Sequence, residues 1–247
     1  MRNFYAAIIA FIFFVFIFSP NAVQAVSVRV PILMYHYIAS NPNPSDRARD
    51  SLSVSPDKFD AQMQYLLQNG YTPISLDTLY GIIYGHASKP EKPVVLTFDD
   101  GYIDFYTNAY PILRKYNFHA VSFIPTKLIG GSYYMSWNQI KEIASSGLVT
   151  FEGHTITHAY LPSLSFSAAF KELSDSKKII ESYTGYPVNF IAYPGGSSNG
   201  NTWAAAQKAG YVGGLGTWYG KSWGPSMNMP RIKVSGLWNL KEFASRL

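Results

Sequence analysis

Apolar runs of strand length alternate with amphipathic segments of helix length over most of this chain. Residues 93–98 are almost continuously apolar, which is typical of a strand buried on both faces, as in a parallel sheet covered by helices. Residues 57–68 place Phe59, Met63 and Leu66 on one helical face, after an N-cap at Ser55. The other predicted strands are 28–35, 71–75, 120–124, 148–152, 189–192, 211–215 and 231–234. The other predicted helices are 76–84, 103–116, 137–145, 165–183, 202–209 and a short one near Lys241.

This order makes roughly seven βα units in succession, which predicts an α/β fold with a parallel sheet. So many units favour a closed or nearly closed barrel over an open sheet, and 247 residues suit one such domain. Active sites of these barrels gather at the carboxyl ends of the strands. Residues 99–100, 154–158 and 193–195 all follow predicted strands, so we expect them to share one site.

The first 25 residues have the pattern of an export signal. Arg2 is followed by 14 uninterrupted apolar positions at 5–18, and small residues precede a cleavage position after Ala25. The apolar run is shorter than the roughly 20 residues of a spanning helix. We therefore predict a signal peptide over 1–25 and one domain over 26–247, with an uncleaved membrane anchor as the alternative. In both cases the domain is secreted, periplasmic or on the cell surface.

Composition narrows the classes of function. Hydrophobic residues make up 47% of the chain and charged residues 14%, which predicts a large core and argues against wholesale disorder. The absence of cysteine excludes a thiolate metal site. The net charge of +5 comes without any run of five like charges, which argues against nucleic acid as a partner. The basic excess fits either an ordinary solvated surface or contact with anionic cell-surface polymers.

Two adjacent carboxylates end the apolar run at 93–98. Gly101 permits a sharp turn after Asp99 and Asp100, so both side chains can point into the mouth of the barrel. Two close carboxylates must differ in role or in proton affinity, and one metal ligand beside one base meets that condition. Taken alone, an Asp-Asp-Gly sequence is also an ordinary turn.

Two histidines follow the predicted strand at 148–152. One carboxylate and the imidazoles of His154 and His158 are enough to hold a catalytic zinc and leave positions open for water. Either histidine alone would fit a hydrogen-bonded loop residue, but the pair at the same barrel end as Asp99 and Asp100 favours metal-assisted hydrolysis. Because imidazole and carboxylate ligands accept several metals, we expect a divalent ion, with Zn²⁺ as the first choice.

These segments resemble the polysaccharide deacetylase family, whose catalytic domain is also called the NodB-homology domain or carbohydrate esterase family 4. Residues 97–102 (TFDDGY) and 154–158 (HTITH) match its two main motifs, and the resemblance spans about 30–234. It implies a single deformed (β/α) barrel with about seven parallel strands. It also implies Asp99 as the general base and Asp100, His154 and His158 as the metal ligands. Water activated by the metal would attack an acetamide carbonyl, with the Tyr102 backbone N–H stabilising the oxyanion.

The chain departs from the family pattern at two places. Ala192 stands where the family carries an arginine that tethers the base, two residues before Pro194. No histidine follows His158, although a late family motif supplies a general-acid histidine. The opening segment 31–37, which contains Tyr-His, resembles the branch that deacetylates poly-N-acetylglucosamine. We therefore expect His36 to act as acid or substrate contact, with a purely structural histidine as the alternative.

The resemblance implies an exported, metal-dependent hydrolase that removes N-acetyl groups from a polysaccharide containing N-acetylglucosamine. Poly-N-acetylglucosamine, peptidoglycan and chitin-like polymers are the candidate substrates. Aromatic side chains stack on sugar rings, so Tyr102, Tyr193 and Trp218, with Pro194, are the predicted substrate-binding residues. The alternatives are an O-acetyl esterase acting on a glycan and a non-catalytic glycan-binding surface protein. We expect a monomer, associated with a membrane or cell surface only through its N-terminal segment.

Overall fold

The structure is a computed structural model that describes residues 28–43, 45–222 and 224–247. The predicted signal peptide over 1–25 lies outside the described residues. Within these ranges, no helix combines the length and the apolar character needed to cross a membrane.

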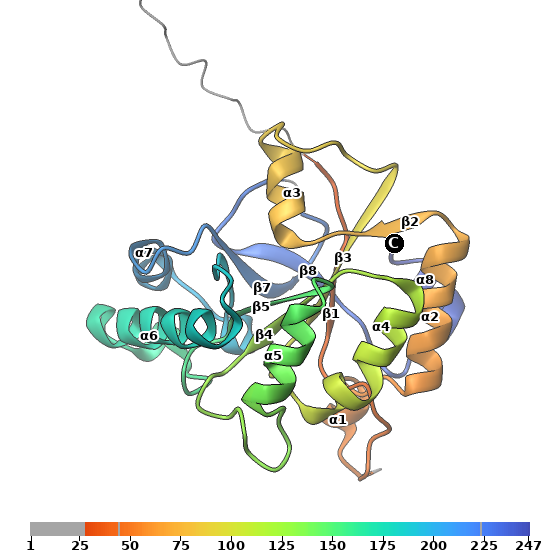
Figure 1. Ribbon diagram of the computed structural model, residues 1–247, viewed down its shortest axis with the longest axis horizontal. Helices are drawn as coiled ribbons and strands as arrows, with labels where there is room; N and C mark the ends of the chain where they lie inside the picture. Colours follow the sequence, from red (N-terminus) through yellow and green to blue (C-terminus); the bar gives the residue numbers. More distant parts are fainter. Residues whose placement is uncertain (1–27, 44, 223) are drawn as a thin grey trace, which may run out of the picture.

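Seven parallel strands form a closed ring, in the order β1, β8, β7, β6, β5, β4, β3 and back to β1, and β2 adds to β3 (Figure 1). The strands are β1 (Ile32–Tyr35), β2 (Tyr71–Pro73), β3 (Lys92–Phe98), β4 (Ala120–Ile124), β5 (Val149–Gly153), β6 (Phe190–Ala192), β7 (Gly213–Tyr219) and β8 (Met229–Lys233). The register between β7 and β8 shifts between Leu215 and Tyr219, which makes the ring irregular. The predicted deformed barrel is therefore confirmed.

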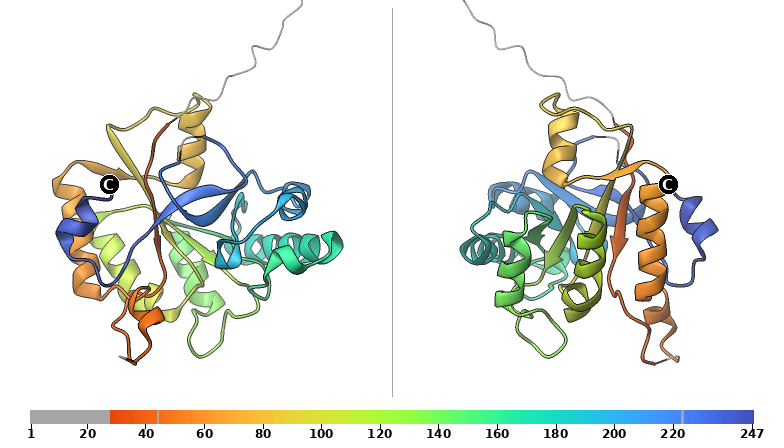
Figure 2. Two further views of the ribbon diagram at one scale, coloured as in Figure 1. Left: turned by 180° about the vertical axis from the view of Figure 1, so that it is seen from behind. Right: turned by 45° about the vertical axis from the view of Figure 1, so that its right-hand side comes forward.

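Helices cover the outside of the ring, as the turned view in Figure 2 shows for α2, α4 and α5. The α-helices are α1 (Arg47–Asp50), α2 (Pro56–Gln68), α3 (Leu76–Ile83), α4 (Tyr110–Tyr116), α5 (Trp137–Ser145), α6 (Phe166–Thr184), α7 (Gly200–Lys208) and α8 (Leu240–Ala244). The helix predicted over 103–116 is in fact a π-helical turn, Phe105–Ala109, that runs into α4. Pro111 near the start of α4 has no backbone N–H to donate, so regular α-helical bonding is interrupted there.

The two faces of the strands belong to two separate apolar clusters. One lies between the barrel and its outer helices and includes Phe59, Leu96 and Phe151. The other fills the barrel interior, where Phe123 and Phe190 are fully buried. Along β3, for example, Val94 and Leu96 belong to the outer cluster and Val95 to the inner one, as expected for a barrel with a packed centre.

Helix α3 is not part of the outer ring of helices. Its apolar residues Leu76, Leu79 and Ile83 pack with the interior cluster, next to Val28 and Val30. The helix therefore closes the end of the barrel at which the strands begin. Figure 1 places α3 at one end of the molecule and α1 at the other, where the strands finish. The segments with candidate chemistry lie at this second end.

Candidate metal centre and active site

Three predicted metal ligands meet at the mouth of the barrel. Asp100 follows β3, and His154 and His158 follow β5. The Asp100 Oδ1 atom lies 3.2 Å from Nε2 of His154 and 3.3 Å from Nε2 of His158. One ligand atom from each of the three residues can be chosen so that all lie within 4.8 Å of one another. The structure thus brings together residues that are more than 50 positions apart in sequence.

This donor set fits a divalent metal. In a tetrahedral site with bonds of about 2.0 Å, neighbouring ligand atoms lie about 3.3 Å apart, which matches the two distances from Asp100. The Nδ1–H of His154 donates to the backbone carbonyl of Ala192 at 2.6 Å, which leaves Nε2 to face Asp100. His154 is buried, whereas the His158 side chain is 41% exposed, so the cluster opens to solvent on one side.

The backbone at the cluster adopts strained, left-handed conformations at residues that are not glycine. Asp100, Thr155 and His158 have φ values of +74°, +65° and +60°, in the left-handed region that favours glycine. Within the described residues only one other non-glycine residue has positive φ, Asn117, and it ends α4 as an ordinary helix cap. Strain of this kind persists at functional sites when the rest of the fold over-determines the conformation.

Electrostatics inside the cluster favour a positive charge. Burial alone would raise the pKa of Asp100, but hydrogen bonds from His154 and His158 hold it well below its usual range. Burial would lower the pKa of His154, yet its hydrogen bond to Asp100 and the charges of both aspartates raise it overall. The carboxylates therefore attract a cation to the position that the imidazoles face.

A buried arginine fixes the orientation of Asp99 beside the cluster. Arg231 in β8 donates from Nη1 and Nη2 to the two Asp99 oxygens, at 2.7 Å each. Both residues are buried, and Arg231 is fixed further through Thr97 Oγ1 and the carbonyl of Gly216. Such a bidentate pair fixes the plane of the carboxylate as well as its charge. Asp99 thus has one defined orientation at the mouth.

The pKa of Asp99 is set by two opposing effects. Burial would raise it, but the charge and hydrogen bonds of Arg231, together with His154 and His36, lower it below the usual value. The carboxylate is therefore ionised at neutral pH and able to accept a proton.

Arg231 is a site residue that the sequence reasoning missed. The tether expected near Pro194 is absent, since position 192 is an alanine, and an arginine on a different strand occupies that role toward Asp99. The available signal was an arginine at the start of the strand predicted over 231–234. A buried arginine inside a barrel strand requires an acidic partner.

His36 directly follows β1 and lies at the same mouth. Burial lowers its pKa, while the negative charges of Asp99 and Asp100 oppose that shift. The neutral imidazole is therefore favoured at neutral pH. Its interaction with both aspartates indicates that His36 lies beside the cluster, and it is not among the three residues grouped as metal ligands.

The predicted substrate-binding residues fall into two groups. Tyr102 and Trp218 lie at the mouth, and the Trp218 side chain is 41% exposed with its indole N–H bonded to the Asn228 carbonyl. Tyr193 departs from the prediction, because its side chain is fully buried in the core. Its hydroxyl fills space left by Gly214, where a Cβ would lie only 2.5 Å away. Pro194 is also buried, at the start of a 3₁₀ turn after β6.

The backbone of Tyr102 is suited to bind an oxyanion. The N–H group of Tyr102 has no hydrogen-bond acceptor among the described residues, although its neighbour Ile103 donates to the Tyr133 carbonyl. This N–H lies two residues after Asp100, at a sharp turn through Gly101 with φ +71°. A free donor beside a metal cluster is the arrangement needed to stabilise developing negative charge.

Comparisons with known proteins point to one family. A family model described as polysaccharide deacetylase matches residues 86–214. YxkH of Bacillus subtilis (strain 168), whose name places it among polysaccharide deacetylases, is 37% identical over 189 residues, covering 76% of this chain and 64% of the relative. The poly-beta-1,6-N-acetyl-D-glucosamine N-deacetylase of Escherichia coli (strain K12) is 36% identical over 135 residues, covering 48% of this chain and 20% of the relative. The chain thus spans less than two thirds of both relatives.

A solved structure extends the similarity over nearly the whole described chain. The Streptococcus pyogenes deacetylase PplD, determined in complex with acetate, superposes with a TM-score of 0.81 at 32% identity. The alignment covers 89% of this chain and 98% of that protein.

Proposed function

The chain belongs to the polysaccharide deacetylase family, and on that basis we propose that it hydrolyses N-acetyl groups of a polysaccharide containing N-acetylglucosamine. The observation that carries this proposal is the division of labour between two adjacent aspartates. Asp100 Oδ1 faces two imidazoles, whereas both oxygens of Asp99 accept from Arg231. One carboxylate is thereby placed as a ligand and its neighbour as a base.

The metal would be held by Asp100, His154 and His158, and we propose Zn²⁺ as the ion. These three ligands leave one side open, as in catalytic zinc sites. When bound, the ion supplies Lewis-acid activation of water and of the substrate carbonyl.

The residues of the chain supply the remaining steps. Asp99 accepts a proton from the attacking water, and Arg231 keeps the carboxylate aimed at it. The Tyr102 backbone N–H donates to the oxygen of the acetamide carbonyl as it gains negative charge. The carbon–nitrogen bond then breaks, acetate leaves, and the sugar keeps a free amine.

The leaving nitrogen needs a proton, and we propose roles for two groups at the mouth. The proton that Asp99 has accepted is available for the amine. His36 favours its neutral form, so we assign it a hydrogen-bonding role toward the substrate or leaving nitrogen rather than that of a stored acid.

Two further features support the substrate and its location. The Escherichia coli relative is named for poly-beta-1,6-N-acetyl-D-glucosamine, and the Streptococcus pyogenes structure holds acetate, the acid product of deacetylation. The pattern of residues 1–25 supports export, so that the domain would meet an extracellular or cell-wall polymer. We propose that it acts there as a monomer.

The test is acetate release from poly-β-1,6-N-acetylglucosamine, from chitin oligomers and from O-acetylated xylan, each with and without added Zn²⁺. We expect release from one of the first two, dependent on the metal. Release from xylan alone would indicate the O-acetyl esterase instead. Binding of a glycan with no release from any substrate, at full metal occupancy, would indicate a non-catalytic glycan-binding protein.

A further inference from the structure

A polar, aromatic cavity lies beside the metal cluster. Its volume is about 250 Å³, and it opens at the same barrel end as α1 in Figure 1. The lining residues come from the segment after β1, from α1, and from the segments after β3 and before α5: Tyr37, Arg49, Tyr102, Ile103, Asp104, Tyr133 and Tyr134. The proposed reaction uses only the backbone of one of these residues, Tyr102.

The cavity is tied directly to the turn that carries Asp100. Ile103 N–H donates to the Tyr133 carbonyl at 2.9 Å, and Met135 N–H donates to the Gly101 carbonyl at 3.0 Å. The segment with Tyr133 therefore runs antiparallel to the turn after β3. A ligand held in the cavity would have a fixed position relative to the metal ligands.

Most of the aromatic faces around the cavity are already covered. The Arg49 guanidinium lies 3.8 Å from the centre of the Tyr37 ring, and Tyr37 stacks on Tyr102 at 4.0 Å. Tyr102 stacks in turn on Tyr134 at 5.3 Å. The predicted stacking of a sugar on Tyr102 is therefore blocked on both faces of its ring, so the ring edges are left to line the cavity.

Tyr133 is the exception. Its side chain is 76% exposed, and its ring has no aromatic or cationic partner among the described residues. Arg49 makes no ion pair or side-chain hydrogen bond within the same residues, and its Nε is buried without a partner, so the two Nη groups are the donors offered to a ligand. Asp104 accepts from the Ile38 N–H through Oδ1 at 3.2 Å, which leaves Oδ2 as an acceptor. An open aromatic face next to unused donors and acceptors suits a sugar ring, which has apolar faces and a polar edge.

We propose that this cavity is a subsite for the sugar unit next to the one being deacetylated, with the ring on Tyr133 and its oxygens accepting from Arg49. The inference rests on the proposed function, because a neighbouring unit exists only in a polymeric or oligomeric substrate. The subsite would favour substrates of at least two linked units and would position the acetylated unit over the cluster.

The test compares a tetramer of β-1,6-linked N-acetylglucosamine with 4-nitrophenyl acetate, which offers an acetyl group but no second sugar. For the Zn²⁺-loaded full chain, we measure the ratio of kcat/KM for the tetramer to kcat/KM for the aryl ester. Removing an aromatic anchor from a binding site reduces affinity by about tenfold, so Tyr133→Ala should lower the ratio by that factor, mainly through KM for the tetramer. Arg49→Gln should lower it in the same direction.

Tyr186→Ala is the matched control. Tyr186 is also an exposed tyrosine (55%) that lines a cavity, but at the opposite end of the barrel, and its loss should leave the ratio unchanged. An unchanged ratio in Tyr133→Ala would overturn the subsite.

Failure of the proposed function would look different. The wild type would then release acetate from neither compound. Calorimetric binding of the tetramer to the wild type and to Tyr133→Ala would decide in that case. Equal affinities, or no binding to the wild type, would overturn the subsite, and a tenfold weaker affinity of the variant would support it.

Discussion

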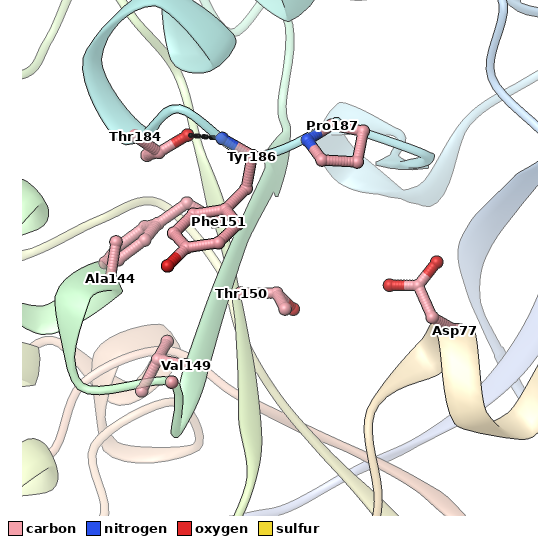
Figure 3. A pocket seen from close by; sticks show the side chains of 9 residues that line it. Asp77, Ala144, Val149, Thr150, Phe151, Thr184, Tyr186 and Pro187 are labelled. Atoms are coloured by element: carbon pink, nitrogen blue, oxygen red, sulfur yellow. Dashed lines mark hydrogen bonds between the residues drawn. The ribbon is translucent and has the colours of Figure 1, made fainter.

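Each end of the barrel carries a cavity, and the two cavities have similar volumes but different chemistry. The one beside the metal cluster has about 250 Å³ and is lined by tyrosines, one arginine and one aspartate. The one at the end where the strands begin has about 270 Å³ and is largely apolar. Figure 3 shows this second cavity, with the Asp77 carboxylate on one side and the rings of Phe151 and Tyr186 on the other. The two cavities therefore differ in the chemistry of their lining side chains and not in volume.

Backbone conformation separates the two ends as well. Around the second cavity the left-handed positions are taken by Gly147 and Gly185, for which positive φ brings no strain. At the mouth the same region of φ is occupied by Asp100, Thr155 and His158. Two of these three side chains belong to the candidate metal cluster. The difference indicates that the mouth retains strained residues because their side chains are needed there.

The largest predicted effect is on catalysis at the mouth. Asp99→Asn keeps the shape of the side chain but removes the base, so acetate release should fall by about 10³-fold. Asp77→Asn makes the same change in the second cavity and should leave acetate release within about twofold. Steady-state rates on one N-acetylated oligomer measure both. An equal loss of acetate release in the two variants would contradict the assignment of catalysis to the mouth of the barrel.

The next effect is on folding stability. Arg231→Met leaves the Asp99 charge buried without a partner, which should lower the free energy of unfolding by about 3–5 kcal/mol. Combining Arg231→Met with Asp99→Asn removes both charges and should recover most of that loss, while activity stays absent. Urea unfolding of the two variants and the wild type tests this. A double variant as unstable as the single one would show that the loss is not due to the unpaired charge.

Metal binding should stabilise the protein by a smaller amount. Free Zn²⁺ at 100 times its Kd adds about 2.7 kcal/mol, provided that the unfolded chain does not bind it. That corresponds to a rise in Tm of about 5–10 °C. His158→Asn removes one ligand and keeps a residue that tolerates positive φ, so this variant should lose most of the rise. Thermal scans with and without Zn²⁺ measure the effect, and an equal rise in both proteins would place the metal elsewhere.

The smallest predicted effect contrasts two buried carboxylates. Glu152 has no arginine partner, accepts from the N–H groups of Asn189 and Phe190, and has a pKa raised above 4.5, first by burial and also by Asp77. The folded protein therefore holds a proton that the unfolded chain releases, so stability falls as pH rises above about 4.5. Asp99, with its lowered pKa, has the opposite sign and loses stability as pH falls.

Glu152→Gln should therefore become more stable relative to the wild type as pH rises from about 5 to 6, by up to about 1.4 kcal/mol. Unfolding in urea at both pH values gives the difference directly. A difference that is independent of pH would mean that Glu152 has the same pKa in the folded and unfolded chain.

The sequence predicted the bounds of an element well where a local signal, such as a helix cap, marks its start or end. Helix α5 was predicted at 137–145 and observed as Trp137–Ser145, because Ser136 and Gln139 form a capping box at its start. Strand β7 was predicted at 211–215 but spans Gly213–Tyr219. Tyr80 and Tyr193 fill the space where side chains of Gly213 and Gly214 would be. Glycine is therefore required at these positions, and the strand lacks the apolar pattern that would mark its bounds. The place of α3 at one barrel end depends on tertiary packing alone.

The candidate site also contains residues that local sequence signals predicted and residues that only tertiary contacts revealed. Asp99, Asp100, His154 and His158 could be found because two short motifs carry them, and the structure gathers all four at one mouth. Arg231 could not be assigned to Asp99, which lies 132 positions away, because no local pattern links a strand residue to its partner. The open face of Tyr133 likewise became visible only once the other tyrosine rings were seen to cover one another.

The most direct test of the central claim is acetate release during a Zn²⁺ titration of protein stripped of metal by a chelator. A single catalytic ion at Asp100, His154 and His158 predicts negligible release at first, then a linear rise that ends at one equivalent of Zn²⁺, and no recovery in His154→Gln. Full release from protein shown by elemental analysis to be free of metal, or the same recovery in the variant, would contradict it.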